Sequence, residues 1–534
     1  MTQKQSQYLL YALIVILVLS LFHRLELLHL KFEEPRRALV SLEMVKTGDW
    51  LHPTIYGLPY YNKPPLYNWM LGGLQLLFGF ADWVIRIPTV LSLLFIGLIH
   101  TWFFRLKIGL EKALWSALFF VSSVNIYLYF SFQGEMDMVY TLIVYSQILI
   151  IFHYFEKQKY WPLFLISYFL TALGFLTKGL PSIGFQGLTL IGLMIYYRKF
   201  KWFFSLPHVV SGLLSVLLMA SYFIIYDATG GQSEYYLAKL FFEGARRTVD
   251  HSSDFPFVKA FLRFLPLMIY LLSPWSVISG WGIHRSVIKK QYENKWLQFA
   301  LVFLLFNLPL YWLSAGTRDR YLYMFLPFAF LWIVEWVWVA VDKKSMRLIT
   351  AGFFGILGLV AFGFLFTSYT QFPSGWWALT TAGVGFLILT GLVYRYNLPL
   401  LHGWLIALIG FRFIFNTLIF DIRKSEEITV DYPQIVVSIL TAVNDHQVYY
   451  YTPLQHEEDV LPITQEGLYF PCITRLDYTF TYYFDRQAKD PIQYIEFFTG
   501  GQFVIMEATL HVNKTHQLLK EFKLNGTDYV LVKT

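Results

Sequence analysis

Two adjacent carboxylates near the start of the chain stand beside two arginines. Glu33 and Glu34 precede Pro35, and Arg36 and Arg37 follow at once. A carboxylate in such a group can deprotonate an acceptor hydroxyl, while the guanidinium groups hold a phosphate. The same residues also suit a solvated, salt-bridged turn, and composition alone leaves both interpretations open.

These charges open a long segment, residues 29–83, between two apolar runs. The segment continues through Gly48-Asp49-Trp50 and then through Gly57-Leu58-Pro59-Tyr60-Tyr61-Asn62-Lys63-Pro64-Pro65. Loops longer than about 15 residues are usually functional or disordered. The aromatic and proline content argues against disorder. We therefore predict a functional loop.

Other connections between apolar runs also carry charged residues. Glu135 and Asp137 stand where an apolar run begins, and such acidic residues can simply stabilise a helix N-terminus. Lys178 ends an apolar run, where its ammonium group can extend to the membrane surface. His251, in the region of Glu243 to His251, can be an ordinary surface histidine. Each motif is weak evidence by itself.

Arg318 and Arg320 are harder to explain as structural residues. They belong to the motif Gly316-Thr317-Arg318-Asp319-Arg320-Tyr321 at the edge of an apolar run. A charge at the edge of the bilayer costs roughly 2–3 kcal/mol unless it is paired. A phosphate partner would offset that cost, so we predict an anion site here.

The elements that must position these residues are membrane helices. The chain has 534 residues, of which 56% are hydrophobic and 14% charged, whereas a soluble protein has about 25% charged residues. A helix needs about 20 apolar residues to cross a bilayer. The sequence contains thirteen such segments. The stretch between Pro64 and Phe80 is interrupted by Gly72 and Gly73, so we expect it to lie in the membrane interface. Twelve or fourteen spans are the alternatives to thirteen. The thirteen segments are 8–28, 84–106, 112–130, 136–155, 160–177, 180–197, 206–226, 258–283, 296–314, 320–341, 348–368, 376–394 and 398–420.

Basic residues in the short connections orient these spans, because Lys and Arg concentrate on the cytoplasmic side. The apolar run from Tyr8 to Phe22 has no small-residue cleavage site, so we expect a retained signal anchor with its N-terminus inside. Every second connection is then basic, and thirteen spans place the C-terminus and all the motifs above on the outer face. The basic connections hold Arg105, Lys107 and Lys112; Lys157 and Lys159; Arg198, Lys199 and Lys201; Arg285, Lys289, Lys290 and Lys295; Lys343, Lys344 and Arg347; and Arg395.

The composition changes near Ile422, after which charges become frequent. We predict a transmembrane domain over residues 1–421 and a small extracytoplasmic α/β domain over residues 422–534. The expected strands of this domain are 447–451, 502–506 and 528–532, and the expected helices are 434–443 and 516–522.

Composition also excludes several classes of function. Cys472 is the single cysteine, so the chain forms no internal disulfide, and no Cys/His cluster offers a closed zinc site. The net charge is +7, but the basic residues are scattered between apolar runs, which argues against a nucleic-acid partner. The sequence has no evident internal repeat, which argues against a transporter built from inverted repeats.

Taken together, the motifs resemble a known family. The first loop is similar to that of the bacterial aminoarabinose transferase and protein O-mannosyltransferase family of C-type (GT-C) glycosyltransferases. The likeness covers nearly the whole membrane portion, and it implies a GT-C fold with thirteen spans and an outer C-terminal domain. It rests on Glu33-Glu34-Pro35-Arg36-Arg37-Ala38, Glu43-Met44, Gly48-Asp49-Trp50 and residues 57–66, with support from Arg86-Ile87-Pro88, Asp137-Met138 and residues 175–179, 243–251 and 321–327.

The resemblance implies a transferase in the bacterial inner membrane. Such an enzyme moves a sugar from a polyprenyl-phosphate donor, such as undecaprenyl phosphate, to an acceptor outside the cytoplasm. In-line attack would invert the anomeric centre. In the family the first acidic residue of the loop motif is catalytic, a position held here by Glu33, with the adjacent Glu34 as the alternative. Matching positions make Arg36, Lys63, Arg246, Arg318, Arg320 and Lys178 candidates for binding the donor phosphate, with Asp137, Tyr60, Tyr323 and His251 in support.

The resemblance also bears on metal binding. In the aminoarabinose transferases, a glutamate before the loop lysine and a histidine in a later outer loop hold a zinc ion. Here Asn62 stands at the first position, while His251 matches the second. An amide is a poor zinc ligand. We therefore make no firm prediction of a cofactor and leave a divalent metal open, with the polyprenyl-phosphate sugar as the donor substrate.

Other functions are also compatible with the sequence. A flippase or exporter of lipid-linked sugars would need many helices and phosphate-binding cations, but its charges should lie near mid-membrane, so the pattern favours the enzyme. An inactive relative whose C-terminal domain is a binding module is a third hypothesis. The sugar stays open, and so does the acceptor, which could be lipid A, a Ser or Thr of a secreted protein, or another surface glycan.

Overall fold

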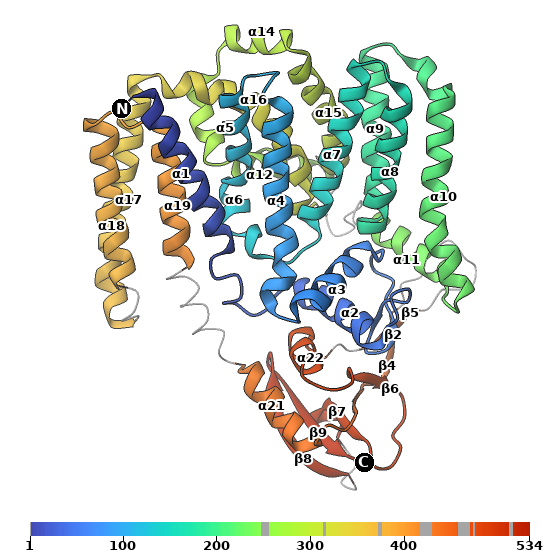
Figure 1. The fold of residues 1–534 in the computed structure, drawn as a ribbon. Helices are drawn as coiled ribbons and strands as arrows, with labels where there is room; N and C mark the ends of the chain where they lie inside the picture. The colour runs from blue at the N-terminus through green and yellow to red at the C-terminus, as the bar shows by residue number, and fades with distance from the viewer. Residues whose placement is uncertain are drawn as a thin grey trace.

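The computed structural model consists of a bundle of helices with a smaller, sheet-containing domain at one end (Figure 1). The N-terminus lies at the bundle end remote from this domain, and the C-terminus lies within the domain. The structure describes residues 2–246, 256–312, 317–371, 376–416, 430–457, 470–473, 476–511 and 516–534.

The bundle confirms a multi-pass membrane architecture. Among the described residues, eight helices are long and apolar enough to cross a membrane, and the number rises to ten if two bent pairs each count as one span. The eight are α1 (Gln3–Phe22), α4 (Asp82–Phe104), α7 (Asp137–Glu156), α8 (Tyr160–Lys178), α10 (Leu206–Ala228), α15 (Lys295–Trp312), η4 with α16 (Asp319–Phe325 and Leu326–Val341) and α17 (Lys344–Gln371).

The two bent pairs and three shorter helices occupy the remaining predicted segments. One pair bends by 51° and the other by 98°. Each of the thirteen predicted segments therefore coincides with a helix or a bent pair, while the number of true spans stays a prediction. The pairs are α5 (Leu110–Val121) with α6 (Val124–Leu128) and η1 (Phe130–Phe132), and α12 (Pro256–Leu271) with α13 (Trp275–Ser279) and η3 (Gly280–Gly282); the shorter helices are α9 (Pro181–Tyr196), the apolar part Leu379–Arg395 of α18 (Trp376–Arg395), and α19 (Leu400–Ile414).

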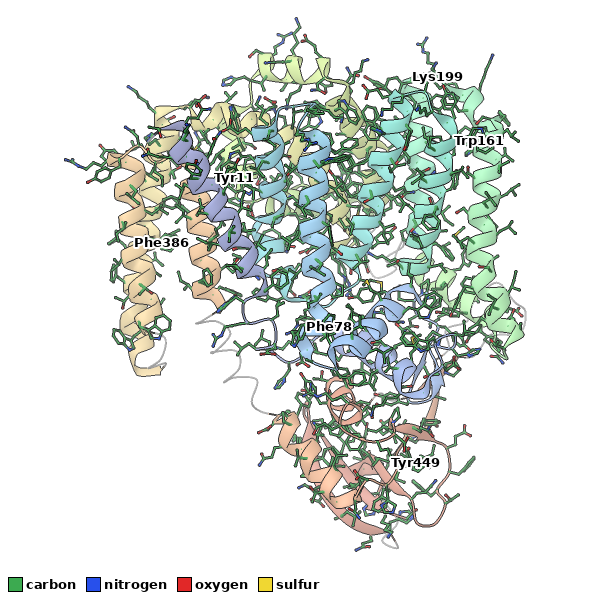
Figure 2. The ribbon with its side chains drawn as sticks, viewed as in Figure 1. Tyr11, Phe78, Trp161, Lys199, Phe386 and Tyr449 are labelled. Carbon is green, nitrogen blue, oxygen red and sulfur yellow. The ribbon has the colours of Figure 1, made fainter. Side chains whose placement is uncertain are left out.

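Three further elements join the spans outside the predicted segments. They are η2 (Phe200–Phe204), α11 (Ser233–Arg246) and α14 (Arg285–Glu293). The connection that contains Lys199 lies at the bundle end opposite to Tyr449 of the C-terminal domain (Figure 2).

The predicted first loop is largely structured. It contains α2 (Glu34–Thr47), a short hairpin of β1 (Thr54–Ile55) and β2 (Leu58–Pro59), and α3 (Leu66–Phe78). Helix α2 begins with a proline in its first turn and ends at Gly48, whose φ of 74° suits the left-handed cap. Helix α3 has 13 residues, too few to span a bilayer, as expected for the interfacial stretch.

A buried glutamate holds the hairpin of this loop. Tyr56 and Gly57 both have positive φ, as a tight two-residue hairpin turn requires. The carboxylate of Glu43 accepts hydrogen bonds from the amide of Tyr56 at 2.7 Å, the amide of Gly57 at 3.3 Å and the hydroxyl of Thr54 at 2.7 Å. Helix α2 thereby fixes the turn.

The C-terminal domain is an α/β domain, as predicted. Its five-stranded sheet has the order β6-β3-β7-β9-β8, with β3 parallel to both β6 and β7, and with β9 antiparallel to both β7 and β8. The predicted boundary at residue 422 lies outside the described residues. The elements are α21 (Tyr432–Val443), β3 (Val448–Tyr451), β4 (Leu454–Glu457), β5 (Phe470–Ile473), α22 (Tyr478–Asp485), β6 (Gln493–Ile495), β7 (Phe503–Glu507), η6 (Ala508–Leu510), β8 (Gln517–Leu524) and β9 (Thr527–Lys533).

One predicted element of this domain is wrong. Residues 516–522 were expected to be helical, but they lie almost entirely in strand β8. The reason is the turn that follows: Asn525 and Gly526 have φ of 47° and 91°, and they close a hairpin in which Leu524 pairs with Thr527. An Asn-Gly turn strongly favours a hairpin over a helix.

The C-terminal domain packs against the first loop, with α22 lying against α2 (Figure 1). The hydroxyl of Tyr483 donates to Asp82 at 2.6 Å, and that of Tyr56 donates to the carbonyl of Leu476 at 2.8 Å. The apolar side chains of α2 and α22 share one buried cluster with the sheet. The loop and the domain therefore form one packed unit beneath the bundle.

Candidate functional site

A small polar cavity, of ≈ 60 Å³, is lined by residues from element ends that lie on the side of the bundle facing the C-terminal domain (Figure 1). We call its lining the charged cluster. Four separate regions supply it: the start of α2, the start of α7, the end of α8 and the start of η4, together with the residue before the two prolines of the first loop. The lining residues are Glu33, Arg36, Arg37, Lys63, Glu135, Met136, Asp137, Lys178, Arg318, Arg320 and Tyr321. Seven of them, Glu33, Arg36, Lys63, Asp137, Lys178, Arg318 and Arg320, were predicted site residues.

Glu33 is the first-loop carboxylate in this cavity. It is the N-cap residue of α2, and its side chain is 29% exposed. Its carboxylate pairs with the guanidinium of Arg36, and it lies 3.5 Å from that of Arg37. A carboxylate so placed is held by cations yet open to a reactant.

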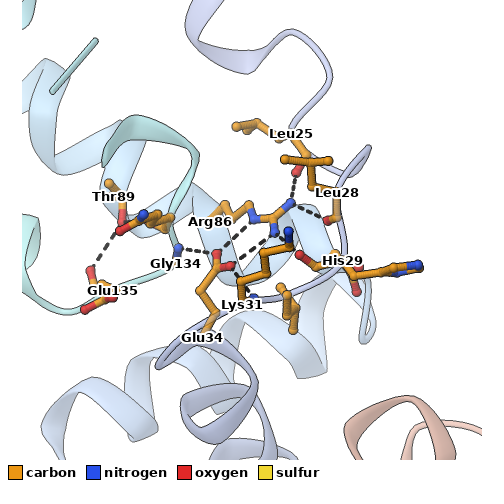
Figure 3. Close-up of polar contacts among 12 residues, drawn as sticks. Leu25, Leu28, His29, Lys31, Glu34, Arg86, Thr89, Gly134 and Glu135 are labelled. Atoms are coloured by element: carbon orange, nitrogen blue, oxygen red, sulfur yellow. Dashed lines mark hydrogen bonds and ion pairs between the residues drawn. The ribbon is translucent and has the colours of Figure 1, made fainter. Parts of the chain in front are cut away.

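Glu34 has a different environment, shown in Figure 3. Its carboxylate accepts from Arg86 Nε at 2.9 Å and Nη2 at 3.2 Å, from the amide of Gly134 at 2.6 Å and from that of Lys31 at 2.9 Å. Both oxygens are thus engaged, and the residue is buried. We call this arrangement the Glu34–Arg86 clamp. The same guanidinium also donates to the carbonyls of Leu25, Leu28 and His29.

The clamp ties four segments together at the cavity. Its members come from the segment between α1 and α2, from the start of α2, from α4 and from the turn before α7. Because the carboxylate of Glu34 bonds to Gly134, it also fixes the position of the neighbouring Glu135. Glu34 therefore has a positioning role, and it does not line the charged cluster.

On the other side of the cavity, acidic and basic residues alternate. The ammonium of Lys178 lies 2.5 Å from Asp137 Oδ1, and Arg320 pairs with Glu135 and lies 3.6 Å from Asp137 Oδ2. Burial, followed by the charge of Asp137, raises the pKa of Glu135 to about 7. Lys178 also lies 4.5 Å from the centre of the Tyr321 ring. Stabilisation of a helix N-terminus by Glu135 and Asp137 and extension of Lys178 to the membrane surface, the alternatives for these residues, do not explain such buried contacts.

Arg318 stands apart from this pairing. It is exposed, and among the residues that the structure describes its side chain has no ion pair or hydrogen bond. It lines the charged cluster and also a second cavity of ≈ 280 Å³, whose walls include Arg320, Tyr323 and Asn125. A guanidinium at the junction of two cavities is well placed to meet an anion.

The remaining predicted residues lie near the cluster or outside the described part. Tyr60 is buried and accepts a hydrogen bond from Arg37, while the hydroxyl of Tyr323 donates to Asn125 at 2.5 Å in the second cavity. Arg246 ends α11, and nothing is described of its side chain. His251 lies outside the described residues.

Three residues that shape the site are not among the predicted site residues. Arg37 could have been found from its spacing, because residue i+4 on a helix faces Glu33. Arg86 could have been found as a charge inside an apolar run, which needs a partner. Glu135 was noticed in its motif, but only its contact with Arg320 indicates that it belongs to the cluster.

The described part of the chain offers no set of side chains that suits a metal ion. No group of three or more His, Cys, Asp or Glu side chains there could hold an ion. Beside Lys63 stands the amide of Asn62, and the carboxylates of the charged cluster are paired with Lys and Arg.

Comparison with known proteins links the chain to one group of enzymes. Residues 62–226 match the family described as dolichyl-phosphate-mannose-protein mannosyltransferase. The undecaprenyl phosphate-alpha-4-amino-4-deoxy-L-arabinose arabinosyl transferase of Edwardsiella ictaluri is 25% identical over 56% of this chain and 54% of its own length. The enzyme of the same name from Aeromonas hydrophila is 25% identical over 61% of this chain and 60% of its own. The matched region thus spans little more than half the length of these relatives.

The fold comparison covers the whole chain. ArnT from Cupriavidus metallidurans, in a crystal structure bound to undecaprenyl phosphate, matches with a TM-score of 0.69 over 99% of this chain and 98% of its own, at 16% identity. The apo structure of the same protein gives 0.66. The chain is therefore similar in sequence to the aminoarabinose transferases and has their GT-C fold, as the first-loop motif predicted.

Proposed function

We propose that this chain is a membrane glycosyltransferase that moves a sugar from a polyprenyl-phosphate donor to an acceptor outside the cytoplasm. The observation that carries the proposal is the charged cluster, which brings Glu33 together with five of the six predicted phosphate-binding cations at one end of the bundle. The similarity to arabinosyl transferases and to a fold that binds undecaprenyl phosphate supports it.

The cations of the cluster suit the leaving phosphate. When the bond between sugar and phosphate breaks, negative charge accumulates on the phosphate, and preorganised guanidinium and ammonium groups lower the barrier. Arg318 is open to the cavity, whereas Arg320 and Lys178 are held in place by Glu135 and Asp137. Each buried methylene of the donor tail contributes about 0.8 kcal/mol, so the donor stays in the bilayer and its phosphate reaches this depth.

Glu33 suits the role of activating or positioning the acceptor. If the acceptor is a hydroxyl, a placed carboxylate removes its proton, an effect of about 10²- to 10⁴-fold. If the acceptor is a phosphate anion, as on lipid A, the same group would orient it. In-line attack on the donor would invert the anomeric centre.

We place the charged cluster and the C-terminal domain outside the cytoplasm. The basic connections support this orientation, since Lys199 lies at the bundle end opposite to the C-terminal domain (Figure 2). The alternative function, a flippase of lipid-linked sugars, is less well supported, because the charges of the cluster gather at one end of the bundle.

The test uses purified protein in liposomes with radiolabelled undecaprenyl-phosphate sugars and an envelope extract that supplies acceptors. We expect transfer by the parent chain, and a loss of at least about 100-fold in Glu33→Gln. The matched control is Glu335→Gln, because Glu335 is also a partly exposed, paired glutamate, 2.7 Å from Lys112 and away from the cluster. Equal transfer by Glu33→Gln and its control would exclude a role of Glu33 in the reaction. No transfer from any donor would contradict the proposed glycosyltransferase activity.

A further inference from the structure

A larger cavity lies between the segment before α2 and the C-terminal domain. Its volume is ≈ 500 Å³, within the range of about 300–1,000 Å³ that is usual for small-molecule sites. We call it the interdomain cavity. The membrane domain contributes residues 29–32 and Pro35, and the C-terminal domain contributes Val430, Tyr432, Asp477, Tyr478, Thr479 and Asn525.

The polar groups on the domain side are held in a fixed arrangement. Asp477 caps α22 by accepting from the amide of Phe480 at 2.8 Å, and its other oxygen accepts from Asn525 and from the hydroxyl of Tyr432. On the opposite wall stand His29 and Lys31. A carboxylate, an amide, a phenol and an ammonium around one cavity form a set that matches neighbouring hydroxyl groups.

The interdomain cavity shares a lining residue, Phe32, with the cavity that contains Arg318. Phe32 lines the interdomain cavity, a smaller cavity beside the clamp and the cavity that contains Arg318. Its side chain is 70% exposed, and its φ is 58°, a conformation that is costly for a residue other than glycine. Such strain is concentrated at functional sites. Phe32 directly precedes Glu33, so it separates the two compartments at the reactive carboxylate.

We propose that the interdomain cavity binds the carbohydrate headgroup of the acceptor, so that the C-terminal domain supplies half of the acceptor site. This inference rests on the proposed function. The donor is not the occupant, because its prenyl tail requires a site at bilayer depth, whereas half of this cavity belongs to the domain beyond the helix ends. Phe32 and the segment that follows it then lead the acceptor to Glu33.

Protection from labelling tests binding without turnover. Asn525→Cys is made in a Cys472→Ser background and labelled with a bulky hydrophilic maleimide in the presence of a soluble glucosamine disaccharide, with or without phosphates. We expect either disaccharide to slow labelling at least about threefold, and the two arms show whether phosphate contributes. The matched control is Asn444→Cys, because Asn444 is also an exposed asparagine with positive φ in the same domain but lies outside the cavity. Protection by a Ser/Thr peptide instead, or equal labelling in all arms, would overturn the proposal.

Kinetics of the labelled protein give a second test. With lipid A vesicles as acceptor and undecaprenyl-phosphate sugar as donor, labelling of Asn525→Cys should raise the acceptor KM at least about tenfold over that of the unlabelled variant, with the donor KM unchanged. Labelled Asn444→Cys should behave as the unlabelled protein does. An unchanged acceptor KM in labelled Asn525→Cys would overturn the inference. If the parent transfers no sugar, the proposed function fails, while the protection result still decides whether a saccharide binds here.

Discussion

Glu34→Gln should destabilise the fold, whereas Glu33→Gln should slow the reaction and leave the fold nearly unchanged. The carboxylate of Glu34 is buried and accepts four hydrogen bonds, two of them from Arg86. Glutamine removes the charge, and it replaces one accepting oxygen by an amide that meets other donors. The guanidinium of Arg86 then stays buried without its anion.

The expected cost follows from the geometry of the clamp. Removing one partner of a buried, hydrogen-bonded ion pair costs about 3–5 kcal/mol. A partly exposed pair such as that of Glu33, whose side chain is 29% exposed, contributes about 0–1 kcal/mol. The two neighbouring substitutions should therefore differ by several kcal/mol in stability.

Thermal unfolding in detergent measures this difference, followed by the fluorescence of the 17 tryptophans. A loss of 1 kcal/mol lowers the midpoint by roughly 2–4 °C in domains of 150–250 residues, and we expect at least that shift for Glu34→Gln. All variants are heated at one rate, because unfolding of such proteins is often irreversible.

Arg86→Met provides the internal control, because it breaks the same clamp from the other side. The double variant Glu34→Gln/Arg86→Met should be less destabilised than the sum of the two single variants. A Glu34→Gln protein that unfolds at the parent midpoint and yet transfers no sugar would refute the clamp and assign the reaction to Glu34.

Two further predictions concern the cluster and the loop. Arg318→Met should raise the donor KM at least about tenfold in initial-rate measurements, because its exposed guanidinium lines both cavities, and an unchanged KM would exclude it from donor binding. Burial raises the pKa of Glu43 to about 7 from its usual 4.5, so the folded chain retains a proton that the unfolded chain releases. The stability from this group is complete below about pH 4.5 and falls by up to roughly 3 kcal/mol as the pH rises through 7. The unfolding midpoint should therefore fall over that range, and Glu43→Gln should flatten the slope; parallel slopes would contradict the assignment.

The membrane helices could be predicted from the sequence because an apolar run of sufficient length has few other structures available in a bilayer. The sheet of the C-terminal domain was harder to predict from the sequence. Leu518 and Phe522 have the spacing of a helix face, and only the Asn-Gly turn after them indicated the hairpin that they form. A local turn signal outweighed the periodicity.

The sequence also could not show which of the two glutamates lines the cavity, because a shift of one position at the start of a helix gives a side chain different surroundings. Successive residues point about 100° apart around a helix, so Glu33 faces the cavity and Glu34 faces Arg86. The partners of Glu34 lie 52 and 100 positions away in the chain. No local pattern encodes such distant contacts.

The packing of the first loop against α22 has a consequence for biogenesis. Chains are made from the N-terminus, and their domains generally fold in that order, yet α2 and its hairpin find their buried partners in residues 476–494, which are synthesised long after them. Until those residues have been made, the segment that carries Glu33 lacks the part of its packing surface that they supply. A nascent chain, or one truncated before residue 476, would therefore sit in the bilayer with a loose, inactive loop, so that synthesis of the C-terminal domain also switches the site on.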